Sequence, residues 1–170
     1  YIQNSYDSNV NAEIKDDAKI STSALSVTSE LDQIDVTIGL ANAQSKTFGF
    51  EGVFNWLSAD NDTTAHISKN ADINVRGDKE GDKLVLSAID NSNFVNIAGA
   101  VLHGENTGVG ASVAITDLNK NTQAYIGDTI TSAATEATGS LSVDTEAKIQ
   151  AANEGNVIGL TLAGAVSKTS

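Results

Sequence analysis

The sequence predicts an all-β chain folded as a parallel β-helix, a solenoid of roughly eight turns. Three observations support this fold class. A unit of 53 to 59 residues recurs, apolar residues alternate with a period of two, and the 170 residues contain no proline. Proline cannot donate a backbone hydrogen bond to a neighbouring strand, so its absence favours strands that are paired on both sides.

Three kinds of anchor define the recurring unit. The first has the form polar-Ala-X-Ile and occurs at Asn11–Ile14, Thr64–Ile67 and Gln123–Ile126. The second begins with leucine at Leu25, Leu84 and Leu141, and the third is an apolar run that begins at Val36, Val95 and Val157. We therefore expect three related units, about 9–61, 62–120 and 121–170, and we expect the chain to be one segment of a larger protein.

Within the units, the alternation of apolar residues is typical of half-buried strands. One such face is formed by Ile34, Val36, Ile38 and Leu40, and another by Val109, Ala111, Val113 and Ile115. We expect these apolar faces to point inward. At roughly 20 residues per stacked turn, each unit would make two or three turns of a solenoid.

A glycine-rich stretch, GVGASVAITDLNKNTQAYIGD (Gly108–Asp128), could be a phosphate-binding loop, a nucleophile elbow or a strand. The first two motifs need a helix directly after the glycines. Alternating, β-branched residues follow Gly110 instead, and both histidines of the chain precede this stretch. The stretch is therefore predicted to be a strand in which neighbouring turns approach too closely for large side chains.

Composition narrows the classes of partner. The formal charge is −12, with only 10 Lys and Arg against 22 Asp and Glu. This balance argues against binding to nucleic acid or to anionic lipid through a basic surface. The apolar, uncharged run Gly155–Ser167 is shorter than the ~20 residues of a membrane-spanning helix, so we expect no membrane insertion.

The segments GVGASVAITDLNKNTQAYIGD, GSLSVDTEAKIQ and VIGLTLAGAV together resemble the repeats of large filamentous haemagglutinin-like adhesins, especially the leukotoxin-type adhesins of Gram-negative bacteria. The resemblance is strongest over residues 108–166 and looser toward residue 1. It implies a right-handed β-helix, a secreted or surface-displayed location, and an outer-membrane export partner. The family pattern supplies no catalytic residue.

Three functions follow as hypotheses. The leading one is a non-catalytic structural or adhesive segment, flanked by further β-helix repeats of the parent chain. The second is direct binding to a host cell-surface protein or glycan. The third is a carbohydrate-active β-helix enzyme, a polysaccharide lyase or hydrolase, which would need paired carboxyl groups beside sugar-stacking aromatic residues. We expect no catalysis, because only eight aromatic residues are present and many acids fall in predicted turns.

Two sets of residues are candidates for partner binding. Arg76, Gly77 and Asp78 form a tripeptide in a predicted turn, of the kind that many integrin ligands present on a loop. The aromatic residues Phe48, Phe50, Phe54 and Trp56 share one face of a predicted strand. We predict that these four fill a wide section of the core. The alternative is an exposed partner-binding patch that includes Phe48, Phe50 and Trp56.

Metal and cofactor sites have weak signals. His66 has no ligand nearby in sequence, and His103-Gly104-Glu105 supplies two ligands at best, so zinc is not expected. No cofactor is predicted. Calcium at acidic turns is the alternative, and the candidate turns are Asp16-Asp17, Asp60-Asn61-Asp62 and 78–82.

Overall fold

The computed structural model describes residues 1–105, 107–128 and 138–167, which form ten strands. No helix occurs in these ranges, and so no membrane-spanning helix is found in them. The first three strands are β1 (Ile2–Ile14), β2 (Lys19–Thr22) and β3 (Leu25–Ser45). The next three are β4 (Phe48–Ile67), β5 (Asp72–Val75) and β6 (Lys83–Gly104). The last four are β7 (Thr107–Ile126), β8 (Ser140–Val143), β9 (Glu146–Glu154) and β10 (Val157–Ser167). The all-β prediction is confirmed.

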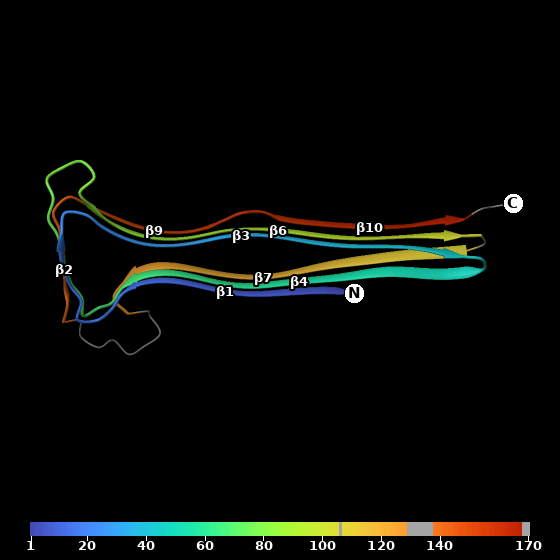
Figure 1. The fold of residues 1–170 in the computed structure, drawn as a ribbon, viewed down its shortest axis with the longest axis horizontal. Coiled ribbons are helices and arrows are strands. Elements are labelled where there is room, and N and C mark those ends of the chain that lie inside the picture. Colours follow the sequence, from blue (N-terminus) through green and yellow to red (C-terminus); the bar gives the residue numbers. More distant parts are fainter. Residues whose placement is uncertain (106, 129–137, 168–170) are drawn as a thin grey trace.

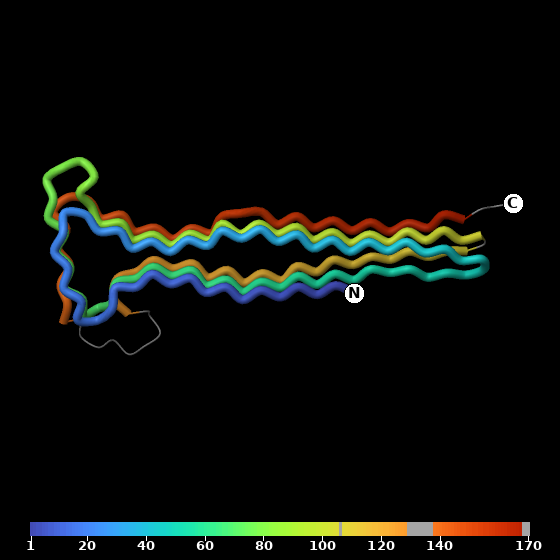
Figure 2. The backbone as a smooth tube through the Cα atoms, in the orientation of Figure 1, coloured from blue at the N-terminus to red at the C-terminus, as the bar shows by residue number. Residues whose placement is uncertain are grey.

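The strands form three parallel sheets, and the chain passes through all three sheets three times. One long sheet has the order β1-β4-β7, and a short sheet has the order β2-β5-β8. In the second long sheet, β3 pairs with one side of β6, while β9 and β10 follow each other along its other side. Figure 1 shows the two long sheets running side by side, with the short sheet joining them at one end. We call this the short-sheet end, and the opposite end, where β3 turns into β4, the turn end (Figure 2).

The register pairs some of the residues that the predicted units place at equivalent positions. Ala12, Ala65 and Ala124 pair in one row, and Leu25 pairs with Leu84. Leu141, however, pairs with Ile73 rather than with Leu84, so the second anchor of the third unit was assigned wrongly. The third apolar run is displaced by one residue, because Ile158 and not Val157 pairs with Val95.

The stacking interval differs from the expected ~20 residues per turn. Hydrogen-bonded side chains of adjacent passes are separated by 53 residues at Glu13 and His66, and by 59 at Asp60 and Asn119. The separation is 63 residues at Asn93 and Asn156. The described residues therefore make three long passes and not eight short turns. Four of the strands are 20 to 22 residues long, so one pass takes nearly as many residues as three short solenoid turns would.

The apolar core lies near the short-sheet end. Its buried residues are Val27, Ala65, Ile67, Ala71, Ile73, Val75, Leu84, Leu86 and Ala88. A smaller cluster of Leu57, Ala59 and Phe94 lies farther along the long sheets. Most of these residues belong to the middle pass, whose strands are paired on both sides. In the outer passes, each strand leaves one of its edges unpaired within the described residues.

Toward the turn end the two long sheets approach closely. A Cβ atom added to Gly110 of β7 would lie 2.5 Å from the carbonyl oxygen of Gly164 and 3.0 Å from that of Ala100. Both carbonyls belong to the facing sheet. Residues 108–116 lie within β7 and are a strand, as predicted. The crowding at Gly110, however, comes from the opposite sheet and not from neighbouring strands of the same sheet.

This narrow interior is lined mainly by small and polar side chains, with Leu102 as an apolar exception, and the apolar face of β3 points outward. Asp35 and Thr37 are buried, whereas Ile34 is 80% exposed and Leu40 75% exposed. Amide side chains bridge the two sheets: Asn55 Nδ2 donates to the carbonyl of Ile97 at 2.6 Å, and Asn96 Nδ2 donates to that of Ile115 at 2.8 Å. The expectation that the alternating apolar faces point inward is wrong here, because the two sheets lie close together and small or polar side chains take most of the inward positions.

We expect Gly110→Ala to lower the free energy of unfolding by about 1–3 kcal/mol, because the added methyl group meets two backbone carbonyls. Gly159→Ala is the matched control, since nothing lies within 4 Å of a Cβ atom there. It should leave stability unchanged or raise it by about 0.4–1 kcal/mol. Urea unfolding followed by circular dichroism measures both. Equal effects of the two substitutions would contradict the close approach of the sheets.

Candidate functional site

The two predicted partner-binding sets lie in different parts of the molecule. Arg76, Gly77 and Asp78 belong to the loop between β5 and β6 at the short-sheet end, drawn in green in Figure 1. The aromatic residues lie on β4 toward the turn end. The structure therefore does not combine them into one site.

The loop that carries Arg76 is held by local contacts. Arg76 Nε donates to Asn74 Oδ1 at 2.9 Å, and the backbone N–H of Lys79 donates to Asp82 Oδ2 at 3.1 Å. Gly77 lies against the side chain of Asp82, where a Cβ atom would clash. Arg76 and Asp78 are exposed on either side of this glycine. The loop has the accessibility that a receptor contact needs, and such a contact stays a prediction.

The aromatic residues of β4 face outward. Phe48 and Phe50 are each 65% exposed and Trp56 is 38% exposed, while Phe54 is half-buried. The interior is contacted by the intervening positions, such as Asn55 and Leu57. The prediction that the four aromatic residues fill the core is therefore wrong. Alternation correctly places them on one face, but it does not say which face is inside.

These residues form part of a continuous surface that we call the aromatic patch. Its members are Tyr1, Phe48, Phe50, Phe54, Trp56, Val109, Val113 and Ile115. The ring of Tyr1 stacks on that of Phe54 with a centroid distance of 5.6 Å, and Phe54 contacts Trp56 at 6.5 Å. The ring of Phe50 extends over Gly52, 3.5 Å from where a Cβ atom would lie. The patch is thus partly organised by its own ring contacts.

Closer to the short-sheet end, the same outer face becomes polar. Asn119 Nδ2 donates to Asp60 Oδ1 at 3.0 Å, and Asn121 Nδ2 donates to Asp62 Oδ1 at 2.9 Å, so neighbouring strands carry paired amides and carboxylates. Asp60 and Asp62 were expected in an acidic turn, but they lie inside β4.

A histidine contact follows along this polar face. His66 Nε2 lies 3.1 Å from Glu13 Oε1, and the His66 ring stacks on Tyr125 with a centroid distance of 5.0 Å. His66 thus pairs with an acid that is 53 residues away in sequence, which spacing could not reveal. The first and last passes both contact this middle-pass side chain.

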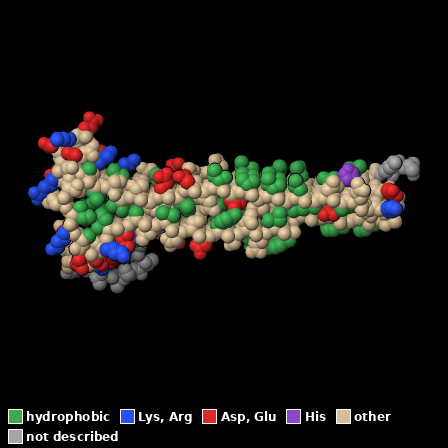
Figure 3. Space-filling model, in the orientation of Figure 1, with side chains coloured by type: hydrophobic (Ala, Val, Ile, Leu, Met, Phe, Trp, Pro, Cys, Tyr) green, Lys and Arg blue, Asp and Glu red, His purple; other side chains and the backbone are tan. Residues whose placement is uncertain are grey.

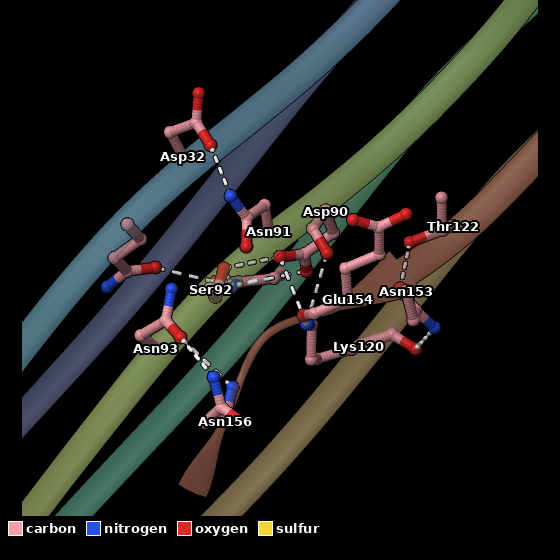
Figure 4. A network of polar contacts seen from close by, with 12 residues as sticks. Asp32, Asp90, Asn91, Ser92, Asn93, Lys120, Thr122, Asn153, Glu154 and Asn156 are labelled. Atoms are coloured by element: carbon pink, nitrogen blue, oxygen red, sulfur yellow. Dashed lines mark hydrogen bonds and ion pairs between the residues drawn. The ribbon is translucent and has the colours of Figure 1, made fainter.

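A buried ion pair connects the two long sheets, and nothing in the sequence singled it out. Asp90 of β6 is fully buried, and Lys120 Nζ of β7 lies 3.2 Å from its Oδ1 atom. Ser92 Oγ and Asn61 Nδ2 also donate to the Asp90 carboxylate. Lys120 Nζ further donates to the backbone carbonyl of Glu154 at 2.7 Å (Figure 4). Charge-assisted hydrogen bonds thus connect β6, β7 and β9 at this point.

A second carboxylate faces the interior near the outer pass. The hydrogen bond to Asp35 raises the pKa of the Tyr6 phenol above its usual value, with smaller contributions from burial and from the negative charge of Asp35. Asp35 also accepts from Thr37 Oγ1 at 3.1 Å, and Asn4 Nδ2 donates to Thr37. These contacts join β1 to β3 across the interior.

No cluster of three or more His, Asp or Glu side chains suited to a metal ion occurs in the described ranges. Asp16 and Asp17 lie in the turn between β1 and β2, where Asp17 adopts a φ of 64°. Asp16 Oδ1 accepts from the backbone N–H of Asn70. Calcium binding at the acidic turns stays a prediction.

A large apolar surface covers the outside of the second long sheet. We call it the aliphatic face; its members are Ile34, Val36, Ile38 and Leu40 of β3, Val95, Ile97 and Val101 of β6, and Ile158, Leu160, Leu162 and Val166 of β10. Figure 3 shows apolar side chains in green along the upper side of the molecule, where Figure 1 places β3, β6 and β10. The sequence reveals the alternation of these residues, but their exposure follows only from the narrow interior behind them.

Comparisons of the chain with family models, with curated proteins and with solved structures give no match. The resemblance to filamentous adhesins therefore stays a prediction.

We expect Phe50→Ala to change the free energy of unfolding by no more than about 0.5 kcal/mol, because the ring is largely in solvent. Phe94→Ala is the contrasting variant, since Phe94 is 1% exposed. It should cost about 3–5 kcal/mol. Denaturant midpoints at unchanged slope measure both values. A large loss of unfolding free energy in Phe50→Ala would show that the aromatic face of β4 is buried after all.

We expect Lys120→Met to lower the free energy of unfolding by about 3–5 kcal/mol, because it leaves the Asp90 carboxylate buried without its cation. The double variant Asp90→Asn with Lys120→Met should regain most of that loss, since an amide can still bond to Ser92 and Asn61. Lys148→Met on exposed β9 is the control and should have little effect. Thermal and urea unfolding give these values; additive losses in the double variant would argue against the ion pair.

Proposed function

We propose that the three passes are coils of a right-handed parallel β-helix, and that the chain is a non-catalytic structural and adhesive segment of a secreted or surface-displayed bacterial filamentous adhesin. One observation carries this proposal. Three successive passes stack in parallel register, with side chains of the same kind in the same rows. The handedness follows the usual chirality of parallel crossovers.

Side-chain contacts between passes support the stacked arrangement. The pairs Asp32–Asn91, Asp60–Asn119 and Asp62–Asn121 each join residues 59 positions apart. Such amide and carboxylate rows form only when passes align without a slip, because a one-residue slip turns every side chain to the other face. The aligned rows thus favour a repeat to which further passes can be added along the stacking direction.

Unpaired strand edges support a place within a longer array. β1 and β3 each pair on one side only, as do β7 and β10, within the residues described. Unpaired edges of this kind accept a further parallel strand, and repeat arrays gain stability from each neighbouring unit. The middle pass shows the effect, since its residues are the most buried. Further passes of the parent chain would cover both edges in the same way.

The shape suits a spacer. Strands of about 20 residues span ~66 Å, and each added pass increases the thickness by ~4.8 Å. A chain of many such passes forms a long fibre whose width is set by the strand length. The exposed aromatic patch favours an adhesive contribution as well, because monomeric proteins seldom leave large apolar patches uncovered. A host protein or glycan bound by this patch is the second candidate function.

Tandem duplication tests the β-helix segment. Two copies of the chain joined directly should form six stacked passes, so small-angle scattering should show one dimension growing by ~14 Å while the ~66 Å dimension is unchanged. Two independent particles connected by a flexible joint would overturn the proposal.

Binding of the single chain and of the tandem protein to host cells and glycan arrays tests the adhesive function. The double variant Phe50→Ala with Trp56→Ala should reduce saturable binding, and Arg76→Ala, in the loop at the short-sheet end, serves as the control. Saturable binding that only Arg76→Ala removes would assign adhesion to the loop instead of the aromatic patch.

A further inference from the structure

We propose that two copies of this chain associate through the aliphatic face, with their strands antiparallel, as a closed pair. This self-association is separate from the stacking of passes, because it uses the outside of a sheet and not a strand edge. It also does not depend on what the parent protein binds. Three features of the aliphatic face favour the pair: its composition, its area and the polar residues at its two ends.

The aliphatic face is continuous across three strands. Its rows are Val36-Val95-Ile158, Ile38-Ile97-Leu160 and Leu40-Gly99-Leu162. The side chains of Ile34, Val36, Ile38, Leu40, Ile158, Leu160 and Leu162 are between 45% and 80% exposed. No charged or polar side chain interrupts these three rows. Leu40 extends toward Gly99, where a Cβ atom would lie 3.0 Å from its Cδ2 atom, so the glycine allows the centre to stay flat.

The area of this surface is sufficient for a specific pair. From the row of Glu30 to the row of Gln44, the outer face of the sheet is about 50 Å long and about 14 Å wide, on the order of 700 Å². A standard interface buries about 800 Å² on each partner. The aliphatic rows would form the apolar centre of such an interface, and the polar rows at either end would form its rim.

The polar residues at the two ends favour an antiparallel pair. Asp32, Asn91 and Glu154 form the row at one end of the aliphatic face, where Asn91 Nδ2 donates to Asp32 Oδ1 at 3.0 Å. The opposite end carries hydrogen-bond donors, with Asn42 and Gln44 on β3 and His103 on β6. An antiparallel pair brings carboxylates against these donors. A parallel pair would bring the Asp32 and Glu154 carboxylates of the two copies together, and like charges in contact are unfavourable.

A pair of identical faces also explains why association would stop at two copies. When the same surface is used by both partners, the pair has twofold symmetry and leaves no further copy of that surface free. Packing of the aliphatic face on the aromatic patch of a neighbour would continue without limit. The aromatic rings are also partly satisfied by their own stacking contacts, as between Tyr1 and Phe54.

Sedimentation equilibrium over a wide range of protein concentration tests the pair. The single chain has a mass of 17.6 kDa, and we expect a reversible species of twice that mass. Ile38→Lys and Leu160→Lys each place a charge at the centre of the face and should weaken association at least tenfold, with unchanged circular dichroism. Thr28→Lys is the matched control, since Thr28 is exposed on the same face of β3 but lies outside the aliphatic rows.

Several outcomes would overturn the proposal. They are a single-chain mass at every concentration, association that Ile38→Lys leaves unchanged, and association that only Val113→Lys on the aromatic patch removes. The tandem protein carrying Ile38→Lys keeps this result separate from the stacking of passes, because its scattering should still show six passes.

The orientation has its own test, because the natural chain contains no cysteine. Asp32→Cys and Asn42→Cys occupy opposite ends of the aliphatic face on β3. The two single-cysteine variants are mixed and treated with a short bifunctional thiol cross-linker, because facing sheets lie about 10 Å apart, too far for a disulfide. We expect cross-links mainly between the different variants, and cross-links mainly between identical variants would overturn the antiparallel arrangement.

Discussion

The close approach of the two long sheets at the turn end is the constraint on which most other features depend. Gly110 faces two backbone carbonyls of the opposite sheet, and no Cβ atom fits between them. Apart from Leu102, which packs against Gly49 and Gly108, the leucines and isoleucines of the apolar rows in this part of the molecule point outward, and amide side chains bridge the gap. The apolar core is consequently displaced to the short-sheet end, where the third sheet holds the long sheets apart.

Burial of polar groups is the second consequence of this constraint. Asn55, Asn61 and Asn96 are fully buried, and each donates a hydrogen bond to the facing sheet or to the Asp90 network. Their side-chain carbonyl oxygens have no partner among the described atoms. Hydrogen bonds between buried polar groups add little net stability, but a buried polar group that loses its partner costs free energy. Such groups therefore select one alignment of the sheets. The amides therefore help to fix the alignment of the two sheets, which apolar contacts alone would specify weakly.

The sequence was sufficient for the strand content, for the parallel repeat and for the row of Ala12, Ala65 and Ala124. It was not sufficient for the direction of the faces. Alternation at Ile34 to Leu40 and at Phe48 to Trp56 indicates two distinct sides, but which side is inside depends on how close a second sheet lies. The turn length was missed for a related reason: a repeat of 59 residues fits one long pass as well as it fits three short turns. The Asp90–Lys120 pair had no local signal at all, because its partners are 30 residues apart on facing strands.

The large sequence separation between paired strands also determines how fast the chain can fold. Parallel stacking leaves no hairpin between neighbouring strands, and the closest partners in the first sheet are 53 residues apart in sequence. Closing such long loops costs entropy before any contact compensates for it, which slows folding of parallel β topologies. With no proline in the chain, slow prolyl isomerisation adds nothing to the delay. Folding is therefore limited by the encounter of distant strands, and a first completed pass would act as the template that shortens every later search.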